Sequence, residues 1–271
     1  MSATGLRSEE ALEQGVAMPR PASRGEGRVL LLRTVTLVVA LALWQALSGN
    51  LVDPFWISSP LAVGAKLWLW ISTGVLFRHL LVTIEETAVG FIVGGVCGVV
   101  LGGLVAQSRI LQRTIDPFVT AVYGIPKVAL APLFIMWFGI GLMPKFVLAG
   151  ISVFFLVFFN TLAGAREVDS SMVDALRMMG ARPAQIHRIV ILPASFPFIF
   201  LGFKLGLPYG FVGAVAGEMM ASNEGIGFLT QNSAGQYDTA GVFAALTALM
   251  TVTVLLDAGL ARLERWVFRW R

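Results

Sequence analysis

The feature of this sequence that most constrains its fold is a series of apolar stretches long enough to cross a lipid bilayer. A helix needs about 20 predominantly apolar residues to span the hydrocarbon layer. The stretches that meet this requirement lie at residues 29–47, 81–106, 121–140, 146–162, 193–215 and 240–260. Only 13% of the residues are charged, about half the share of a soluble domain. The sequence therefore predicts an all-α integral membrane protein with about six transmembrane helices.

The segments outside these stretches predict how the chain is organised. Residues 1–28 are polar and loosely patterned, which is typical of a flexible tail. Residues 29–264 form the predicted transmembrane domain, and residues 265–271 form a short basic and aromatic tail. Within the domain, residues 61–80 contain leucines and tryptophans interrupted by charged residues. This pattern favours an amphipathic helix at the membrane surface.

Lysine and arginine predict the orientation, because they are enriched in the cytoplasmic segments of membrane proteins. Outside the predicted spans they concentrate at the chain ends and in the loops on the same side. Only Lys66, Arg78 and Lys145 fall on the opposite side. Both termini and the long polar loop at residues 165–193 are therefore predicted to be cytoplasmic.

Two of the predicted spans carry glycines at intervals of four residues. These glycines are Gly90, Gly94, Gly98 and Gly102 in the first, and Gly202, Gly206 and Gly210 in the second. Residues four apart share one face of a helix, and glycines on a face let a second helix approach closely. We expect the two ladders to pack helices within one subunit. The alternative is a place at a subunit contact or along a pathway.

The loop at residues 165–193 predicts two short helices joined by a bend. Ser171, followed by Asp174 three residues later, has the spacing of a capping box at a helix start. Gly180 suits a helix C-terminus, where a positive φ is needed. Pro183 suits the first turn of a second helix.

The first of these short helices carries an apolar stripe. Met172, Leu176 and Met179 recur at helical spacing and share one face. An apolar stripe on a projecting helix is costly to leave in water. We expect either another protein or the lipid headgroup layer to cover it.

This loop resembles the cytoplasmic loop of permease subunits from ATP-binding-cassette (ABC) importers. That loop has the form E-A-A, three residues, glycine, nine residues, I-x-L-P. The matching residues here are Asp174, Ala175, Leu176, Gly180, Val190, Leu192 and Pro193. Aspartate, leucine and valine depart from the family pattern at three positions but keep its spacing. The resemblance implies that the loop docks on a separate ATPase subunit. The coupling residues that it implies are Met172, Asp174, Ala175, Leu176, Met179, Gly180, Leu192 and Pro193.

Other short motifs are similar to those of the sulfonate/taurine/nitrate-type permeases. They are Ser59-Pro60, Asp116-Pro117, Ile125-Pro126, the run at 132–141 (PLFIMWFGIG), Asn160-Thr161, Glu218-Met219 and Gly225-Ile226-Gly227. The resemblance implies a type I importer permease in the bacterial inner membrane that works by alternating access. Its implied partners are ATPase subunits, which bind ATP and Mg²⁺, a second permease copy in a homodimer and an extracytoplasmic solute-binding protein. The implied solute is a small anion such as a sulfonate, taurine or nitrate.

Two charged residues are candidates for the solute pathway, because charges within a membrane are expensive and often functional. Lys204 lies inside a predicted span, where it could attract an anion. Its alternatives are a snorkelling side chain and an internal ion pair. Glu218 lies at the outer end of the same span, where a solvated end residue is an equal alternative. Glu86, near the end of another span, is predicted to lie at a wet helix end.

The sequence lacks the motifs of several other functions. It has no phosphate-binding loop, no paired histidines or cysteines for a metal site, and too few histidines for a serine–histidine–acid arrangement. The arginines lie beside apolar segments rather than in one block, which argues against nucleic acid. We therefore expect no cofactor and no catalytic role. A gradient-driven secondary transporter is the alternative, although it predicts acidic residues deep in the spans.

Overall fold

The computed structural model describes residues 26–268, which are helical apart from turns and an isolated bridge between Ser48 and Val52. These residues divide between Val52 and Asp53 into two compact units. The first unit contains α2 (Glu26–Leu47), a helix long and apolar enough to cross a membrane. The structure extends helices into both predicted tails. Residues 1–25 and 269–271 of those tails lie outside the described residues.

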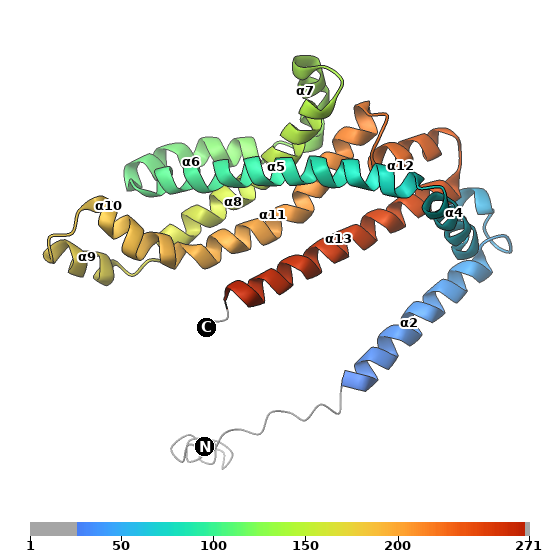
Figure 1. Ribbon diagram of the computed structural model, residues 1–271, viewed down its shortest axis with the longest axis horizontal. Coiled ribbons are helices and arrows are strands. Elements are labelled where there is room, and N and C mark those ends of the chain that lie inside the picture. The colour runs from blue at the N-terminus through green and yellow to red at the C-terminus, as the bar shows by residue number, and fades with distance from the viewer. Residues whose placement is uncertain (1–25, 269–271) are drawn as a thin grey trace, which may run out of the picture. The chain divides into compact units, whose positions relative to one another are not determined.

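The second unit contains the remaining helices (Figure 1). Its first half consists of α3 (Pro54–Ile57), α4 (Pro60–Ser72), α5 (Val75–Ala106), α6 (Arg109–Tyr123), the 3-10 helix η2 (Lys127–Leu130) and α7 (Ala131–Phe138). Its second half consists of α8 (Leu142–Arg166), α9 (Ser170–Met178), α10 (Pro183–Ile186), the π-helical turn η3 (His187–Ile191), α11 (Leu192–Ala221), α12 (Ile226–Gly235) and α13 (Thr239–Val267).

The described residues confirm an all-α protein with about six candidate spans. Five helices are long and apolar enough, namely α2, α5, α8, α11 and α13. A sixth span exists if α6 and the η2–α7 pair are one broken span, with a bend of 81°. The predicted span at residues 121–140 is therefore not one straight helix. Its helix is interrupted at Ile125-Pro126, because a proline disfavours the helical conformation of the residue before it.

The predicted amphipathic helix at residues 61–80 is two helices. α4 ends at Ser72, and Gly74 then adopts a left-handed conformation with φ of 77°. Glycine reaches this region without the steric penalty of a side chain. The next residue, Val75, begins α5, so Arg78 belongs to the first turn of a span.

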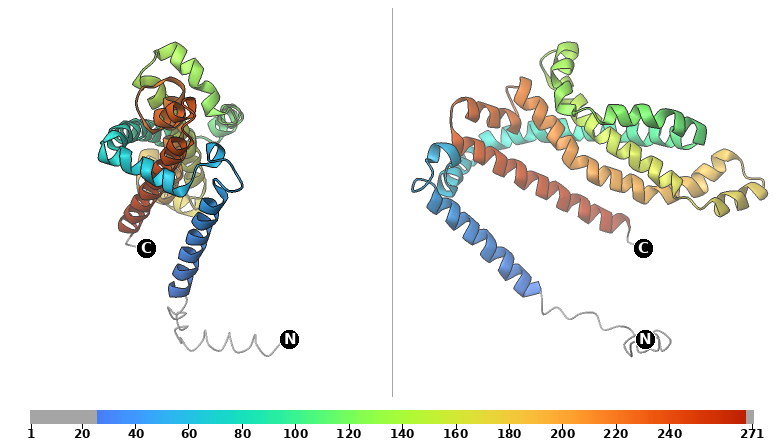
Figure 2. Two further views of the ribbon diagram at one scale, coloured as in Figure 1. Left: turned by 90° about the vertical axis from the view of Figure 1, so that its right-hand side faces the viewer. Right: turned by 180° about the vertical axis from the view of Figure 1, so that it is seen from behind.

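Helix α8 forms the centre of the second unit, with α5 and α11 packed against it (Figure 2). The glycines of both ladders face this helix. A Cβ atom at Gly98 would lie 2.9 Å from the carbonyl oxygen of Phe154, and one at Gly202 would lie 3.0 Å from the Cα of Val157. Because lipid supplies no hydrophobic drive between helices, such close backbone approach is what stabilises their association.

Candidate coupling loop and pathway site

The loop between α8 and α11 begins with a capped helix. The side chain of Asp169 accepts a hydrogen bond of 2.8 Å from the backbone N–H of Ser171. This bond lowers the pKa of the Asp169 carboxyl below its ordinary value. The predicted capping box at Ser171 is wrong, because Ser171 lies inside α9. Aspartate is as good a cap as serine, and a cap two residues earlier provides an acceptor for one of the first free N–H groups.

The same helix ends in the predicted glycine turn. Gly180 has φ of 79°. Its N–H donates to the carbonyl of Arg177 at 2.9 Å, and the N–H of Ala181 donates to the carbonyl of Leu176 at 3.0 Å. These two bonds define a Schellman motif, which satisfies carbonyls that the helix end would leave free. Pro183 then begins α10, as its position predicts.

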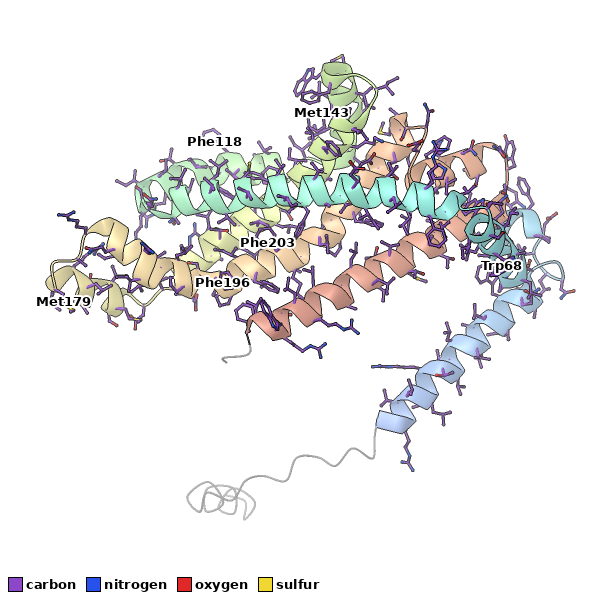
Figure 3. All side chains as sticks on the ribbon, viewed as in Figure 1. Trp68, Phe118, Met143, Met179, Phe196 and Phe203 are labelled. Carbon is purple, nitrogen blue, oxygen red and sulfur yellow. The ribbon has the colours of Figure 1, made fainter. Side chains whose placement is uncertain are left out.

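Three exposed methionines lie on α9 and at its C-terminal end. Met178 and Met179 are 85% and 81% exposed, and Met172 is also exposed. Figure 3 shows Met179 at the far end of this helix, pointing away from the bundle. Leu176 is half-buried. The predicted stripe did not include Met178, because that residue lies off the Met172–Leu176–Met179 face.

The loop connects to α11 without a break in the helical backbone. η3 leads directly into Leu192, and Ile191 already has helical dihedral angles. Val190 is buried, and the Ser195 hydroxyl donates to the carbonyl of Ile191 at 2.7 Å. Leu192 and Pro193 thus form the base of a span whose first turn is continuous with the loop.

The opposite end of the same bundle contains a network of buried polar side chains. Thr83 and Glu86 of α5 are 0% exposed, Glu218 of α11 is 1% exposed and Lys145 of α8 is 4% exposed. Lys145 forms an ion pair with Glu86 and donates to the Ser222 hydroxyl at 3.0 Å. Three spans are therefore joined by groups that lie out of contact with water.

Glu86 does not lie at a wet helix end, so that prediction is wrong. The predicted span began at residue 81, but α5 begins at Val75. Glu86 is consequently about three turns inside the helix, where its side chain points at Lys145. A buried carboxylate needs such a partner, because desolvation of an unpaired charge is costly.

Glu218 holds the turn that precedes α12. One oxygen of its carboxylate accepts from the Thr83 hydroxyl at 2.6 Å, and the other accepts from the N–H of Gly227 at 2.7 Å. The Thr83 hydroxyl also accepts from the N–H of Ile226 at 2.9 Å. Gly225, with φ of 106°, makes the sharp entry. These contacts supply partners for the free N–H groups of a helix start.

Lys204 lies in a different part of α11. Its ammonium group is 2.7 Å from a carboxylate oxygen of Glu264 on α13, and both side chains are about one-third exposed. The structure thus places Lys204 in an ion pair. It does not bring Lys204 and Glu218 together, since 14 residues of helix correspond to about 21 Å.

These features define the class of this protein. Long apolar helices are packed through glycines, and a projecting helical loop is continuous with one span. No group of three or more metal-ligating side chains occurs among the described residues. The chain is a polytopic membrane protein with a projecting helical loop.

Comparisons with known proteins give the family. Residues 94–269 match the family described as binding-protein-dependent transport system inner membrane component. The riboflavin transport system permease protein RibX of Chloroflexus aurantiacus is 36% identical over 87% of this chain and 88% of its own. The taurine transport system permease protein TauC of Escherichia coli is 29% identical over 87% of this chain and 88% of its own.

A solved structure shares the fold. An inward-facing structure of the MetNI methionine ABC transporter matches with a TM-score of 0.61 and 22% identity, covering 69% of this chain and 93% of that chain. This chain belongs to the binding-protein-dependent transport system inner membrane component family. It is the permease subunit of an ABC importer, without a catalytic role of its own, and the ATPase is a separate subunit. The gradient-driven alternative finds no support in these matches.

Proposed function

We propose that α9 and the turn at Gly180 form the surface through which the ATPase subunit drives this permease. The observation that carries the proposal is the exposed methionine surface of α9, joined through η3 to the base of α11. Methionine side chains are flexible and polarizable, which suits a surface that must remain packed while a partner moves. The predicted coupling residues Asp174, Ala175 and Gly180 lie on or beside this surface.

The proposed assembly contains two copies of this chain, two ATPase subunits and a solute-binding protein. The family implies the ATPase and the binding protein. The excess of positive charge in the arginine-rich loops supports a cytoplasmic position for the α9 end and both termini. The binding protein then delivers solute at the end that carries α12. ATP and Mg²⁺ bind the ATPase partner, and this chain needs no cofactor.

The proposed solute is a small organic or inorganic anion of the sulfonate, taurine or nitrate kind. The name of the TauC relative supports taurine, whereas other relatives are named for riboflavin and formylaminopyrimidine. Lys204 contributes little attraction in the described state, because Glu264 already neutralises it. The binding protein therefore remains the main determinant of which solute arrives.

A pulldown tests the coupling role. Gly180→Asp adds a charge on the proposed contact surface, at a position where a Cβ meets no atom within 4 Å. We expect the variant to insert normally and to lose the ATPase encoded beside this chain. Gly139→Asp is the matched control, because Gly139 has φ of 76° and equally open surroundings but follows α7. Normal recovery of the ATPase by Gly180→Asp contradicts the proposal.

A further inference from the structure

Two adjoining cavities lie at the end of the bundle that carries α12. The first, which we call the amide vestibule, has a volume of about 640 Å³ and is lined by the end of α11, the turn after it and α12. The second, which we call the apolar chamber, has a volume of about 600 Å³ and lies among η2, α11, α12 and α13. Met219, Met220 and Gln231 line both cavities. The two cavities therefore share a wall, and each is large enough for a small solute.

The vestibule is lined by uncharged hydrogen-bonding groups. Asn223, Gln231, Asn232 and Gln236 all contribute exposed carboxamide side chains. The amide of Gln236 donates to the side-chain oxygen of Asn232 at 3.2 Å. A carboxamide offers two donors and an acceptor. Such a wall would be costly against lipid tails, so it faces water or protein.

The chamber has the opposite chemistry. Its wall includes Phe211, Val215, Leu249 and Met250, with the Thr253 hydroxyl as a polar group. A solute that enters from the vestibule therefore leaves a surface of carboxamides for a surface of hydrocarbon, and Gln231 lies where the two meet. From the vestibule to the chamber, the lining thus changes from hydrogen-bonding to apolar side chains.

Neither cavity offers a positive charge. Of the described residues that line them, Glu218 alone is ionisable. Both oxygens of its carboxylate are already bonded to Thr83 and Gly227. The nearby Lys145 is paired with Glu86. A bare inorganic anion would lose its hydration in the chamber without meeting a compensating charge.

We infer that the amide vestibule and the apolar chamber form one solute site. It takes a small organic molecule whose hydrogen-bond-accepting head contacts the carboxamides near Gln231 and whose apolar body enters the chamber. The body gains by leaving water, a gain that an inorganic ion cannot make. The inference rests on the proposed function and narrows it, because it favours organic anions over nitrate.

Protection of a reporter cysteine tests the site without the binding protein. Met220→Cys places a thiol where the cavities meet, in a Cys97→Ser background because Cys97 is exposed. The complex with the ATPase is labelled with a maleimide in the presence of hexane-1-sulfonate, methanesulfonate or nitrate. We expect hexane-1-sulfonate to protect most, methanesulfonate less and nitrate not at all. Gln107→Cys, exposed and outside both cavities, is the control thiol and should be labelled equally in every solution.

Substitutions at Gln231 then test the contact with the head group. Gln231→Leu should raise the concentration of hexane-1-sulfonate needed for half-protection about tenfold, the size expected for one lost hydrogen bond. Gln231→Asn keeps the carboxamide and should recover most of the protection. Equal protection by nitrate, no protection by any probe, or an unchanged response in Gln231→Leu overturns the inference. Absence of the ATPase from the purified complex defeats the proposed function instead.

Discussion

The two ends of α11 differ in how they are held. At the α12 end, Glu218 is buried and hydrogen-bonded to α5 and α12, and Lys145 of α8 forms an ion pair with Glu86 of α5. At the α9 end, the chain projects as a short helix whose methionine side chains are exposed. Buried polar contacts fix one arrangement, because every broken contact leaves a group unsatisfied. An exposed apolar surface contributes to stability only when a partner covers it and removes it from water. We conclude that the first end is stabilised internally and the second by assembly.

The largest expected effect comes from removing one partner of the buried ion pair. Lys145→Met leaves Glu86 without its cation, and an uncompensated buried charge costs about 3–5 kcal/mol of stability. The double variant Lys145→Met/Glu86→Met removes both charges and should recover much of that loss. Thermal unfolding in detergent measures both. If the single variant is as stable as the wild type, the buried Lys145–Glu86 ion pair does not stabilise the α12 end.

The next effect tests the glycine contacts that join the two ends. Gly94→Val places side-chain atoms against the backbone of Gly150 on α8, where a Cβ alone already overlaps. Overpacking of this kind costs about 1–3 kcal/mol or more. Gly103→Val on the same helix meets open space and serves as the control. Equal unfolding temperatures for the two variants would contradict the close packing of α5 on α8.

A third pair of substitutions separates assembly from stability. Met178→Ser with Met179→Ser removes exposed apolar surface from α9. We expect the free energy of unfolding of the isolated chain to change by no more than about 0.5 kcal/mol, the range of ordinary surface substitutions. The affinity for the ATPase should fall about tenfold or more, measured by titration of the detergent-purified subunits. A loss of stability without a loss of affinity would show that the α9 methionines stabilise the chain itself and not its complex with the ATPase.

The smallest effect concerns the cap of α9. The pKa of Asp169 is lowered by its hydrogen bond from Ser171, so the ionised carboxylate is favoured in the folded loop. The cap is therefore complete above the ordinary pKa of aspartate, near 4, and is lost as the pH falls through the lowered value. The protection of the Ser171 amide against hydrogen exchange, relative to an unstructured peptide at the same pH, should hold through pH 4 and fall only below it. Above pH 4, Asp169→Ala should reduce this protection, whereas Asp169→Asn keeps an acceptor and should resemble the wild type.

The sequence was sufficient for features that depend on local chemistry. Apolar length predicts the spans, and the spacing of Gly180 and Pro183 predicts the turn before α10. The break at Pro126 was also visible as an X-Pro pair, but the apolar run around it hid the interruption. The burial of Glu86 was missed because it depends on where α5 begins, six residues before the predicted start.

The partners of the charged residues could not be predicted, because they lie far apart in the sequence. Glu264 lies 60 residues from Lys204, and Thr83 lies 135 residues from Glu218. Only the fold brings them together. The carboxamides of the vestibule, by contrast, lie close together in the sequence, and Asn232 and Gln236 have the four-residue spacing of one helix face.

The unbroken passage from η3 into α11 has a mechanical consequence. α11 has 30 residues and is therefore about 45 Å long. If the helix pivots at the network around Glu218, a tilt of about 5° moves its base at Leu192, about 39 Å away, by roughly 3 Å. Pro197 and Pro208 lie inside this helix. Each removes a backbone hydrogen bond, which makes the helix easier to bend at that point. A displacement of the α9 loop can therefore be transmitted in two ways, by tilting of α11 as a whole and by bending of α11 at the two prolines.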